Sequence, residues 1–220
     1  MTEMQKSLAL FSGSVNPELA DKVANELGVS LGNVKLERFS NGEIYARYLD
    51  SVRGADVFLI QSVAGDRIND ALMELLIMAD AAKRASARTI TAVITHYGYA
   101  RQDRKAAARE PITAKLVANL ITSSGITRVM SIDLHQGQIQ GFFDMPVDHL
   151  TALPILADYF KAKNLDHSKL CVVSPDVGRA KAAKKLSDML EADLAIMHKG
   201  RPGHNKAEIT ALIGDVAGKI

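Results

Sequence analysis

The sequence predicts an α/β fold in which a mainly parallel sheet is covered by helices on both faces. Short apolar runs alternate with longer amphipathic stretches along the 220 residues, which is typical of strand–helix–strand units. The second half of the chain repeats this rhythm, and apolar residues make up 47% of the whole, which is enough for a sizeable core. We therefore expect two α/β units, residues 1–148 and 149–220, although no Pro/Gly-rich linker separates them.

Each element of the first half follows from a local signal. Asn16-Pro17-Glu18 has the N-cap, N1 and N2 residues of a helix, and Gly28 is a helix stop. The turn signal Ser40-Asn41-Gly42 joins two alternating segments, which predicts a β-hairpin. The expected strands are 8–11, 34–39, 43–49, 57–60, 90–94 and 128–132, and the expected helices are 17–27, 69–84 and 113–121.

The second half is expected to hold two helices and two strands before an unusual end. The expected helices are 153–160 and 179–190, and the expected strands are 170–173 and 194–197. The apolar residues 209–213 precede a turn-like segment, 214–220, which leads toward a strand that does not follow. A domain seldom ends where a core strand should begin, so we expect the second unit to be incomplete and the chain to be a fragment.

Composition and missing motifs exclude several classes of function. The formal charge of +2 argues against neutralisation of a nucleic-acid backbone, and the single Cys171 excludes an internal disulfide and a thiolate-rich metal site. No apolar run approaches the roughly 20 residues of a membrane helix, and residues 1–6 lack the features of a signal peptide. We therefore expect a soluble cytoplasmic protein with neither a nucleic-acid nor a membrane partner. Residues 214–219 are one residue short of a P-loop, and the other common nucleotide and hydrolase motifs are absent.

Two segments of the first half carry residues suited to a nucleotide. The hairpin tip 38–43 offers an aromatic face, an amide and a carboxylate that could grip an adenine ring, and an ordinary Asn-Gly hairpin is the alternative. The segment 97–105 follows a buried strand, where open α/β sheets bind ligands. Its Arg101, Arg104 and Lys105 could meet phosphate oxygens, and a solvated charged loop is the alternative.

Two further regions suit a metal ion, a sugar or a phosphoryl group. Asp133 and His135 follow a predicted strand, where alternate side chains point the same way, so both could face one metal or phosphate; a structural histidine is the alternative. Asp176 also follows a strand and could hold a metal or sugar hydroxyls. Lys199 and Arg201 lie in a Gly/Pro-rich segment, which is typical of a mobile lid that brings positive charge to a phosphoryl group; a surface loop is the alternative.

Together these segments resemble the ribose-phosphate diphosphokinases, the family that synthesises 5-phosphoribosyl 1-diphosphate (PRPP). The resemblance runs from residue 10 to residue 219. The matching segments are 69–78, 99–103, 111–119 and 133–148, the last of which is similar to the family signature. The resemblance implies two tandem phosphoribosyltransferase-type domains with mainly parallel sheets. The second is incomplete here, because the family continues past the position of Ile220 into an acidic loop that binds ribose 5-phosphate.

The resemblance also implies a reaction and its participants. Family members transfer the β,γ-diphosphoryl group of ATP to O1 of ribose 5-phosphate, with Mg²⁺ as the cofactor, and release AMP. The product serves nucleotide biosynthesis in the cytoplasm. The implied partners are ATP, ribose 5-phosphate and further copies of the same chain, in a dimer-based homo-oligomer or a hexamer. Such chemistry depends on charge neutralisation and in-line positioning more than on covalent catalysis.

The resemblance implies functional roles for five groups of residues, each named for its ligand or its role. In the family, the group that binds adenine usually does so across a subunit interface. The five groups are, for adenine, Phe39, Asn41, Gly42 and Glu43; for the rest of ATP, Arg101 and Gln102; for Mg²⁺, His135, Asp176 and Asp133; for catalysis, on a flexible loop, Lys199 and Arg201; and, for a regulatory phosphate or ADP, Ser51, Arg53 and Arg109.

Two departures from the family and two alternative functions stand beside this interpretation. Residues 177–180 are shorter than the Gly-rich stretch of the family, and residues 106–108 are three alanines where many relatives are charged. A non-catalytic regulatory homologue is the main alternative, and the retained basic pair and metal candidates argue against it. A phosphoribosyltransferase that uses PRPP also suits the fold, but the PRPP-binding loop is missing and the adenine-type hairpin is present.

Overall fold

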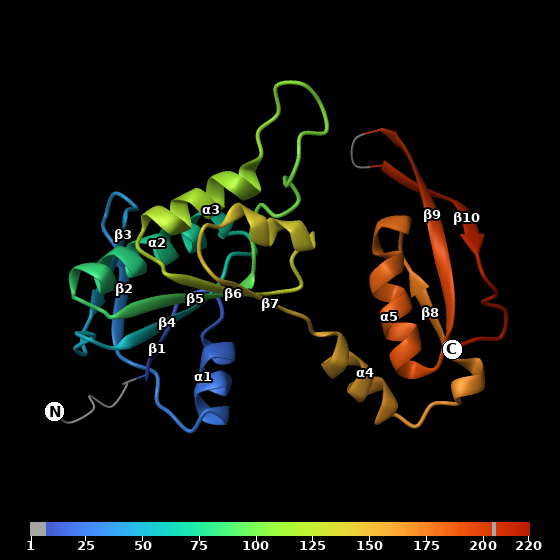
Figure 1. Ribbon diagram of the computed structural model, residues 1–220, viewed down its shortest axis with the longest axis horizontal. Coiled ribbons are helices and arrows are strands. Elements are labelled where there is room, and N and C mark those ends of the chain that lie inside the picture. Colours follow the sequence, from blue (N-terminus) through green and yellow to red (C-terminus); the bar gives the residue numbers. More distant parts are fainter. Residues whose placement is uncertain (1–7, 204–205) are drawn as a thin grey trace. The chain divides into compact units, whose positions relative to one another are not determined.

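The computed structural model describes residues 8–203 and 206–220, and the side chains among them outside 199–210 (Figure 1). The chain divides into two compact units, Met1–Leu150 and Thr151–Ile220, each with its own main sheet. The boundary expected after residue 148 falls inside the last strand of the first unit.

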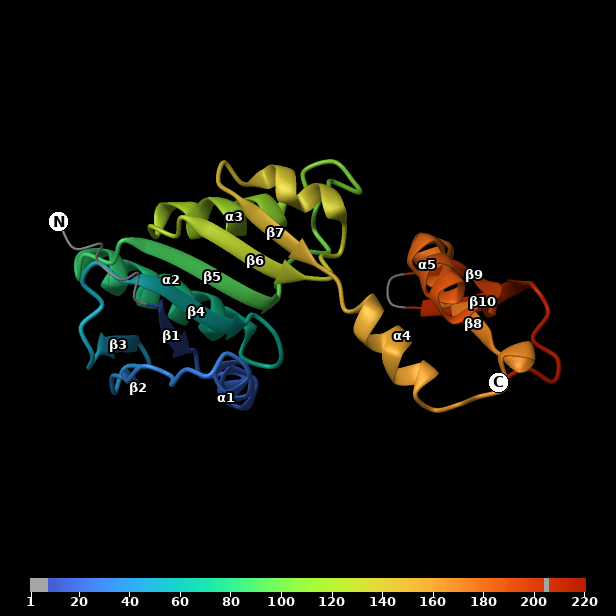
Figure 2. The ribbon, with the colours of Figure 1, turned by 60° about the horizontal axis from the view of Figure 1, so that its bottom comes forward.

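The first unit is built on a five-stranded sheet in which every neighbouring pair of strands is parallel (Figures 1 and 2). In spatial order the strands are β1 (Leu8–Ser12), β4 (Asp56–Ser62), β5 (Thr89–His96), β6 (Arg128–Ile132) and β7 (Val147–Leu150). This arrangement confirms the predicted parallel sheet. The sequence does not predict β7, because the polar Asp148 and His149 interrupt its apolar residues at the edge of the sheet.

Helices cover both faces of this sheet, as predicted. α1 (Pro17–Glu26) packs on one face, and α2 (Ile68–Arg84) and α3 (Thr113–Ser123) lie on the other, together with the 3₁₀ helix η1 (Gly137–Phe142) (Figure 2). The small core under α1 consists of Leu10, Ala20, Ala24 and Ile60. The predicted cap of α1 is present, since Oδ1 of Asn16 accepts a hydrogen bond from the amide of the third helical residue at 3.2 Å.

The predicted hairpin forms a separate two-stranded antiparallel sheet that packs beside α2. Its strands are β2 (Val34–Arg38) and β3 (Ile44–Tyr48), and its inner face joins the main core of the unit. The hydroxyl of Tyr48 donates a hydrogen bond to the Met78 carbonyl of α2 at 2.9 Å. Burial raises the pKa of Tyr48, because the phenolate would lose its hydration.

The second unit has a three-stranded sheet in the order β10-β9-β8. Its elements are α4 (Leu153–Lys161), η2 (His167–Lys169), β8 (Cys171–Ser174), η3 (Val177–Arg179), α5 (Ala180–Leu190), β9 (Asp193–Gly203) and β10 (Lys206–Ile213). β8 and β9 are parallel, and α5 crosses between them, as the alternating pattern predicts. None of the helices in the described residues is long and apolar enough to span a membrane.

The structure differs from the prediction for the expected lid, residues 198–205. The backbone of β9 continues to Gly203 and pairs in antiparallel fashion with β10, so most of the expected loop forms the arms of a β-hairpin. Gly200, Pro202 and Gly203 conceal the strand pattern, because Gly and Pro are depleted in strands. Residues 204–205 and the side chains of Lys199 and Arg201 lie outside the described part of the chain.

The segment after β10 turns back to the beginning of β8. The amide of Ile220 donates to the Lys169 carbonyl at 2.7 Å, and its carbonyl accepts from the Cys171 amide at 3.1 Å. The turn-like segment 214–220 thus leads to the start of β8, an outer strand of the three-stranded sheet.

We expect Tyr48→Phe to lower the free energy of unfolding at pH 7 by about 1 kcal/mol, because one hydrogen bond is lost. The folded-state pKa of this phenol is raised, so its stabilising effect is complete below about pH 10 and is lost as the pH rises further. The stability gap between the parent and the variant should therefore close above about pH 10. Urea unfolding across this range measures the gap, and one that widens would contradict the assignment.

Candidate functional site

The loops of the first unit gather at the carboxyl edge of the parallel sheet. All five strands run in the same direction, so the segments after β1, β4, β5 and β6 begin at this edge. The loop after β1 leads to α1 and the loop after β4 leads to α2, which cover opposite faces of the sheet. Open α/β sheets commonly bind ligands where neighbouring loops diverge in this way.

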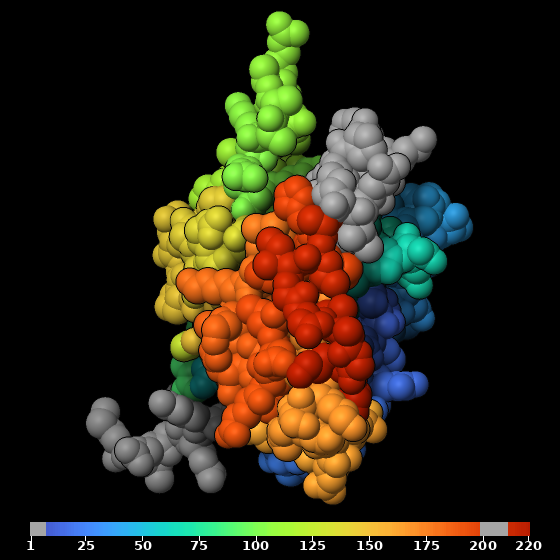
Figure 3. All heavy atoms as spheres, turned by 90° about the vertical axis from the view of Figure 1, so that its right-hand side faces the viewer, coloured from blue at the N-terminus to red at the C-terminus, as the bar shows by residue number. Residues whose placement is uncertain are grey.

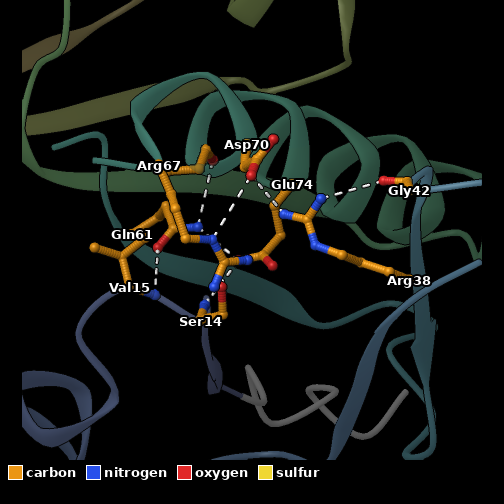
Figure 4. Close-up of polar contacts among 9 residues, drawn as sticks. Ser14, Val15, Arg38, Gly42, Gln61, Arg67, Asp70 and Glu74 are labelled. Atoms are coloured by element: carbon orange, nitrogen blue, oxygen red, sulfur yellow. Dashed lines mark hydrogen bonds and ion pairs between the residues drawn. The ribbon is translucent and has the colours of Figure 1, made fainter. Parts of the chain in front are cut away.

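At this divergence a buried amide and a buried carboxylate fasten the loop after β1 (Figure 4). Oε1 of Glu74 accepts hydrogen bonds from the Ser14 amide and from Nε2 of Gln61, both at 2.7 Å. Oε1 of Gln61 accepts from the Val15 amide at 3.4 Å. A side chain at Gly13 would meet Gln61 at 2.4 Å, so the close approach requires glycine. The loop is therefore held by the protein's own carboxylate, at a place where other α/β folds bind phosphate.

Sequence reasoning misses Glu74 as a positioning group, although a signal is present. The residue lies on the apolar stripe of α2 between Ala71 and Leu75, at helical spacing, and is only 6% exposed. A charged residue on a buried helix face requires hydrogen-bond partners. That rule predicts a polar partner inside the fold but does not identify Gln61.

The hairpin tip brings the predicted adenine residues together. The Phe39 carbonyl accepts from the Gly42 amide at 2.9 Å, and the Phe39 amide donates to the Glu43 carbonyl at 2.9 Å. Oδ1 of Asn41 accepts from the Glu43 amide at 3.2 Å, and Gly42 has a φ of +92°, which favours glycine at this position. Hydrogen bonds within residues 39–43 thus close the tip into a turn, and all five residues are exposed.

The Phe39 ring is an exposed aromatic surface at this tip. It is 53% exposed, and one edge contacts Tyr45 with ring centroids 5.6 Å apart. The two rings line a hollow of about 300 Å³ together with Lys35, Glu37 and Arg38. Lys35 is paired with Glu37 at 2.9 Å and Arg38 with Asp70 at 2.6 Å, so the exposed aromatic face is the feature of this hollow that suits a planar ligand.

The loop between β5 and α3 carries the predicted phosphate contacts and extends from the unit as a finger (Figures 1 and 3). Arg101 is exposed, as a phosphate ligand requires. Gln102 is held at the base of the finger by its backbone and its side chain. Its backbone N–H donates to the Tyr99 carbonyl at 3.0 Å, and its backbone carbonyl accepts from the Ala114 N–H at 3.1 Å. Oε1 of its side chain accepts from the Thr113 hydroxyl. The oxygen of the Gln102 side chain is therefore engaged within the protein.

The finger and the hairpin both contact the first turn of α2. Arg38, at the end of β2, forms an ion pair with Asp70 at 2.6 Å, and the Tyr99 hydroxyl hydrogen-bonds to Asn69 (Figure 4 shows the Asp70 contacts). The structure thus brings two of the predicted ligand-binding segments to one element. The sequence predicts no role for Asn69 or Asp70, although both lie in the segment 69–78, which resembles a segment of the family.

The strand alternation from which a common direction of Asp133 and His135 is predicted does not extend to these two residues. β6 ends at Ile132, and Asp133 has a φ of +47°, so the chain leaves the extended conformation before these residues. The Leu134 amide donates instead to Nε2 of His149 on β7, at 3.0 Å. Asp133 is exposed and His135 is half-buried. His149, which the sequence analysis does not single out, orients the segment that carries both candidates.

The predicted metal residues are divided between the two units, with Asp133 and His135 in the first and Asp176 in the second. Oδ1 of Asp176 caps η3 by accepting from the Arg179 amide at 3.0 Å. Within the ranges that the structure describes, no three His, Cys, Asp or Glu side chains are grouped to hold a metal ion. Mg²⁺ is often held by one or two carboxylates together with water and substrate phosphates. An exposed carboxylate such as Asp133 fits that mode of binding, and an imidazole fits it less well.

The predicted regulatory residues lie at opposite edges of the first unit. Ser51 and Arg53 precede β4, where Gly54 and Ser86 are hydrogen-bonded at the amino edge of the sheet. Arg109 lies in the finger that leaves the carboxyl edge. The eight residues of β5 separate these edges by roughly 23 Å. One copy of this unit therefore does not bring the three residues together.

Comparisons with known proteins agree with this architecture. The sequence family described as the N-terminal domain of ribose phosphate pyrophosphokinase matches residues 8–125. The ribose-phosphate pyrophosphokinases of Fusobacterium nucleatum and Bacillus subtilis are each 53% identical over 214 residues, which is 97% of this chain and 67% of each relative. A solved structure of phosphoribosylpyrophosphate synthetase from Mycobacterium smegmatis is similar, with a TM-score of 0.87 and 47% identity over 96% of this chain and 68% of that chain.

The fold is therefore of the mainly parallel α/β class shared with phosphoribosylpyrophosphate synthetase. The chain belongs to the ribose-phosphate pyrophosphokinase family, as its motifs predict. It spans about two thirds of the length of these bacterial relatives.

Glu74→Leu should lower the free energy of unfolding by about 1–3 kcal/mol, because the Gln61 amide and the Ser14 N–H lose their acceptor. Glu74→Gln is the matched control, since it keeps an acceptor oxygen of the same reach and should lose less stability. Urea unfolding compares the three proteins. A leucine variant as stable as the parent would show that this contact does not hold the loop.

Proposed function

We propose that the chain serves the synthesis of PRPP from ATP and ribose 5-phosphate. In this reaction O1 of the sugar forms a bond to the β-phosphorus of ATP as the bond between that phosphorus and the α,β-bridging oxygen breaks. The O1 proton is released, and AMP leaves with the bridging oxygen. The product, a 1-diphosphorylated ribose, supplies nucleotide biosynthesis, and we place the reaction in the cytoplasm, consistent with a single cysteine and no need for disulfides.

The observation that carries the proposal is the pairing of an exposed aromatic hairpin tip with an arginine-bearing finger on one element, α2. We propose that Phe39 stacks on adenine, while the Asn41 amide and the Glu43 carboxylate hydrogen-bond to its edge. Gly42 gives the tip its shape through a positive φ. Arg101 and Gln102 would face the phosphates, where guanidinium groups bind oxygens in bidentate fashion.

We assign the charge-stabilising role in the reaction to Lys199 and Arg201, on the resemblance to the family's basic pair. Their ammonium and guanidinium groups would interact with the negative charge that develops on the transferred diphosphoryl group. Asp133, His135 and Asp176 would hold Mg²⁺ together with the nucleotide. When bound, Mg²⁺ neutralises phosphate charge and aligns the phosphates for in-line displacement.

We also propose that the chain works as a dimer-based homo-oligomer with a regulatory anion site. Ser51, Arg53 and Arg109 are suited to phosphate or ADP, yet the two edges that carry them lie roughly 23 Å apart in one copy. A site that combines them therefore needs a second copy. The resemblance implies the same for the hairpin tip, which would serve the nucleotide of a neighbouring subunit.

Phe39→Ala should raise the dissociation constant for MgATP about tenfold, because stacking of a base on an aromatic ring is worth about 1–3 kcal/mol. The matched control is Tyr159→Ala on α4, since Tyr159 is 56% exposed and Phe39 is 53% exposed. Isothermal titration calorimetry measures both constants. Equal affinities of the parent and Phe39→Ala would contradict the role of this ring.

The reaction itself is tested by ³¹P NMR of the chain with MgATP and ribose 5-phosphate. We expect signals of AMP and of a diphosphate bound to the sugar, and an unchanged ATP spectrum would contradict activity of this chain.

Lys199→Ala should lower kcat about 100-fold with a nearly unchanged KM for ATP, because its charge acts on the transition state. An equal loss of ATP affinity would place Lys199 in ground-state binding instead.

A further inference from the structure

Two adjacent residues of α2 contact the two segments to which the proposed function assigns adenine and phosphates. Asp70 contacts the hairpin and Asn69 contacts the finger (Figure 4 shows the Asp70 side). Neighbouring residues of a helix point in different directions, so one turn can grip two segments on different sides. Both contacts lie in the first turn, which begins at Ile68.

On the hairpin side, Arg38 closes the tip and fastens it to the helix. Nη1 of Arg38 donates to the Gly42 carbonyl at 3.2 Å, and Nη2 pairs with Oδ2 of Asp70 at 2.6 Å. Arg67 approaches the same carboxylate oxygen at 3.6 Å. A two-stranded ribbon is marginally stable alone, so the position of its tip depends on such contacts. The stem of the hairpin is fixed separately by Tyr48.

On the finger side, Asn69 contacts a residue whose backbone conformation is rare for bulky side chains. Tyr99 has a φ of +64°, and its hydroxyl hydrogen-bonds to Oδ1 of Asn69. The Tyr99 carbonyl in turn accepts from the Gln102 amide, which follows Arg101. The contact with Asn69 therefore links the base of the finger to α2.

We propose that Asn69 and Asp70 are positioning residues that couple the hairpin tip to the Arg101–Gln102 segment. A displacement of the tip that moves Arg38 would shift the first turn of α2 and, through Asn69, the base of the finger. This inference rests on the proposed function for its consequence: a base of the neighbouring subunit's nucleotide bound at the hairpin changes the affinity of this chain's finger for the phosphates of its own nucleotide. Because coupling is reciprocal, phosphate at the finger would order the tip by the same factor.

The coupling can be tested without loss of the fold. The side chains of Arg38 and Asp70 are 37% and 43% exposed, and exposed ion pairs contribute little to global stability. Asp70→Asn weakens the contact from the helix, and Arg38→Gln weakens it from the hairpin with the helix sequence unchanged. Tyr99→Phe removes the contact on the finger side. Asp80→Asn is the matched control, since Asp80 pairs with Arg84 at 2.6 Å on the same helix, is 48% exposed and lies outside this network.

Hydrogen–deuterium exchange of the 220-residue chain reads both sides at once. Asp70→Asn and Arg38→Gln should speed exchange of the Gly42 amide about threefold to fivefold and, to a smaller extent, that of the Gln102 amide. Tyr99→Phe should speed the Gln102 amide and, to a smaller extent, the Gly42 amide. Asp80→Asn should change neither. Changes confined to the mutated side, or equal changes in the Asp80 variant, would overturn the coupling.

The same experiment with MgATP separates the two proposals. We expect MgATP to slow exchange at Gly42 and Gln102 in the parent chain. In calorimetry, the combined Arg38→Gln/Tyr99→Phe variant should lose less affinity than the product of the single losses, because each single change already breaks the link. Crossed exchange effects without any protection by MgATP would contradict the proposed function and leave the coupling supported. Protection by MgATP together with strictly multiplicative losses of affinity in the combined variant would support the proposed function and contradict the coupling.

Discussion

The parallel pairing of the five strands in the first unit is the constraint on which the remaining structure depends. Parallel strands require a crossover after each strand, so every strand of this sheet delivers its next loop to the same edge. The hairpin, the finger and the segment after β6 reach that edge from sequence positions almost 100 residues apart. The apolar layer between the sheet and α2 and α3 holds these loops in register. A site on this edge therefore inherits the rigidity of the core while its own residues remain exposed.

Different physical interactions hold the core and the site. Buried apolar side chains stabilise the sheet, and one buried polar pair, Gln61 and Glu74, fastens the loop after β1. The segments that we propose to bind the nucleotide are held by exposed contacts such as the ion pair of Arg38 and Asp70, each of which contributes little to global stability. Low local stability is what ligand-binding loops require if they are to order around a substrate. The two kinds of contact meet in α2, whose buried face carries Glu74 and whose first turn holds the loops.

The sequence predicts the fold of the first unit well, because continuous apolar runs and the Asn-Gly turn are local signals. It does not predict β7 or the long arms of β9 and β10, since polar residues and Gly200, Pro202 and Gly203 conceal strands that pairing with a neighbour creates. The hairpin tip is predicted from residue types in one short segment. The direction of the Asp133 side chain is not predicted, because its left-handed backbone conformation interrupts the alternation of the strand. Asn69, Asp70 and His149 act through partners distant in sequence, which no local pattern identifies.

The claim that the carboxyl edge of the first unit binds a nucleotide is tested most directly by photoaffinity labelling with 8-azido-ATP and Mg²⁺. The reactive nitrogen on the base marks the segment that holds adenine, and peptide mass spectrometry identifies it. The account predicts saturable labelling within residues 34–48, suppressed by excess ATP and reduced when Phe39 is replaced. ATP-suppressed labelling found only at the amino edge, in residues 50–55 or 84–90, or only in the second unit, would contradict it.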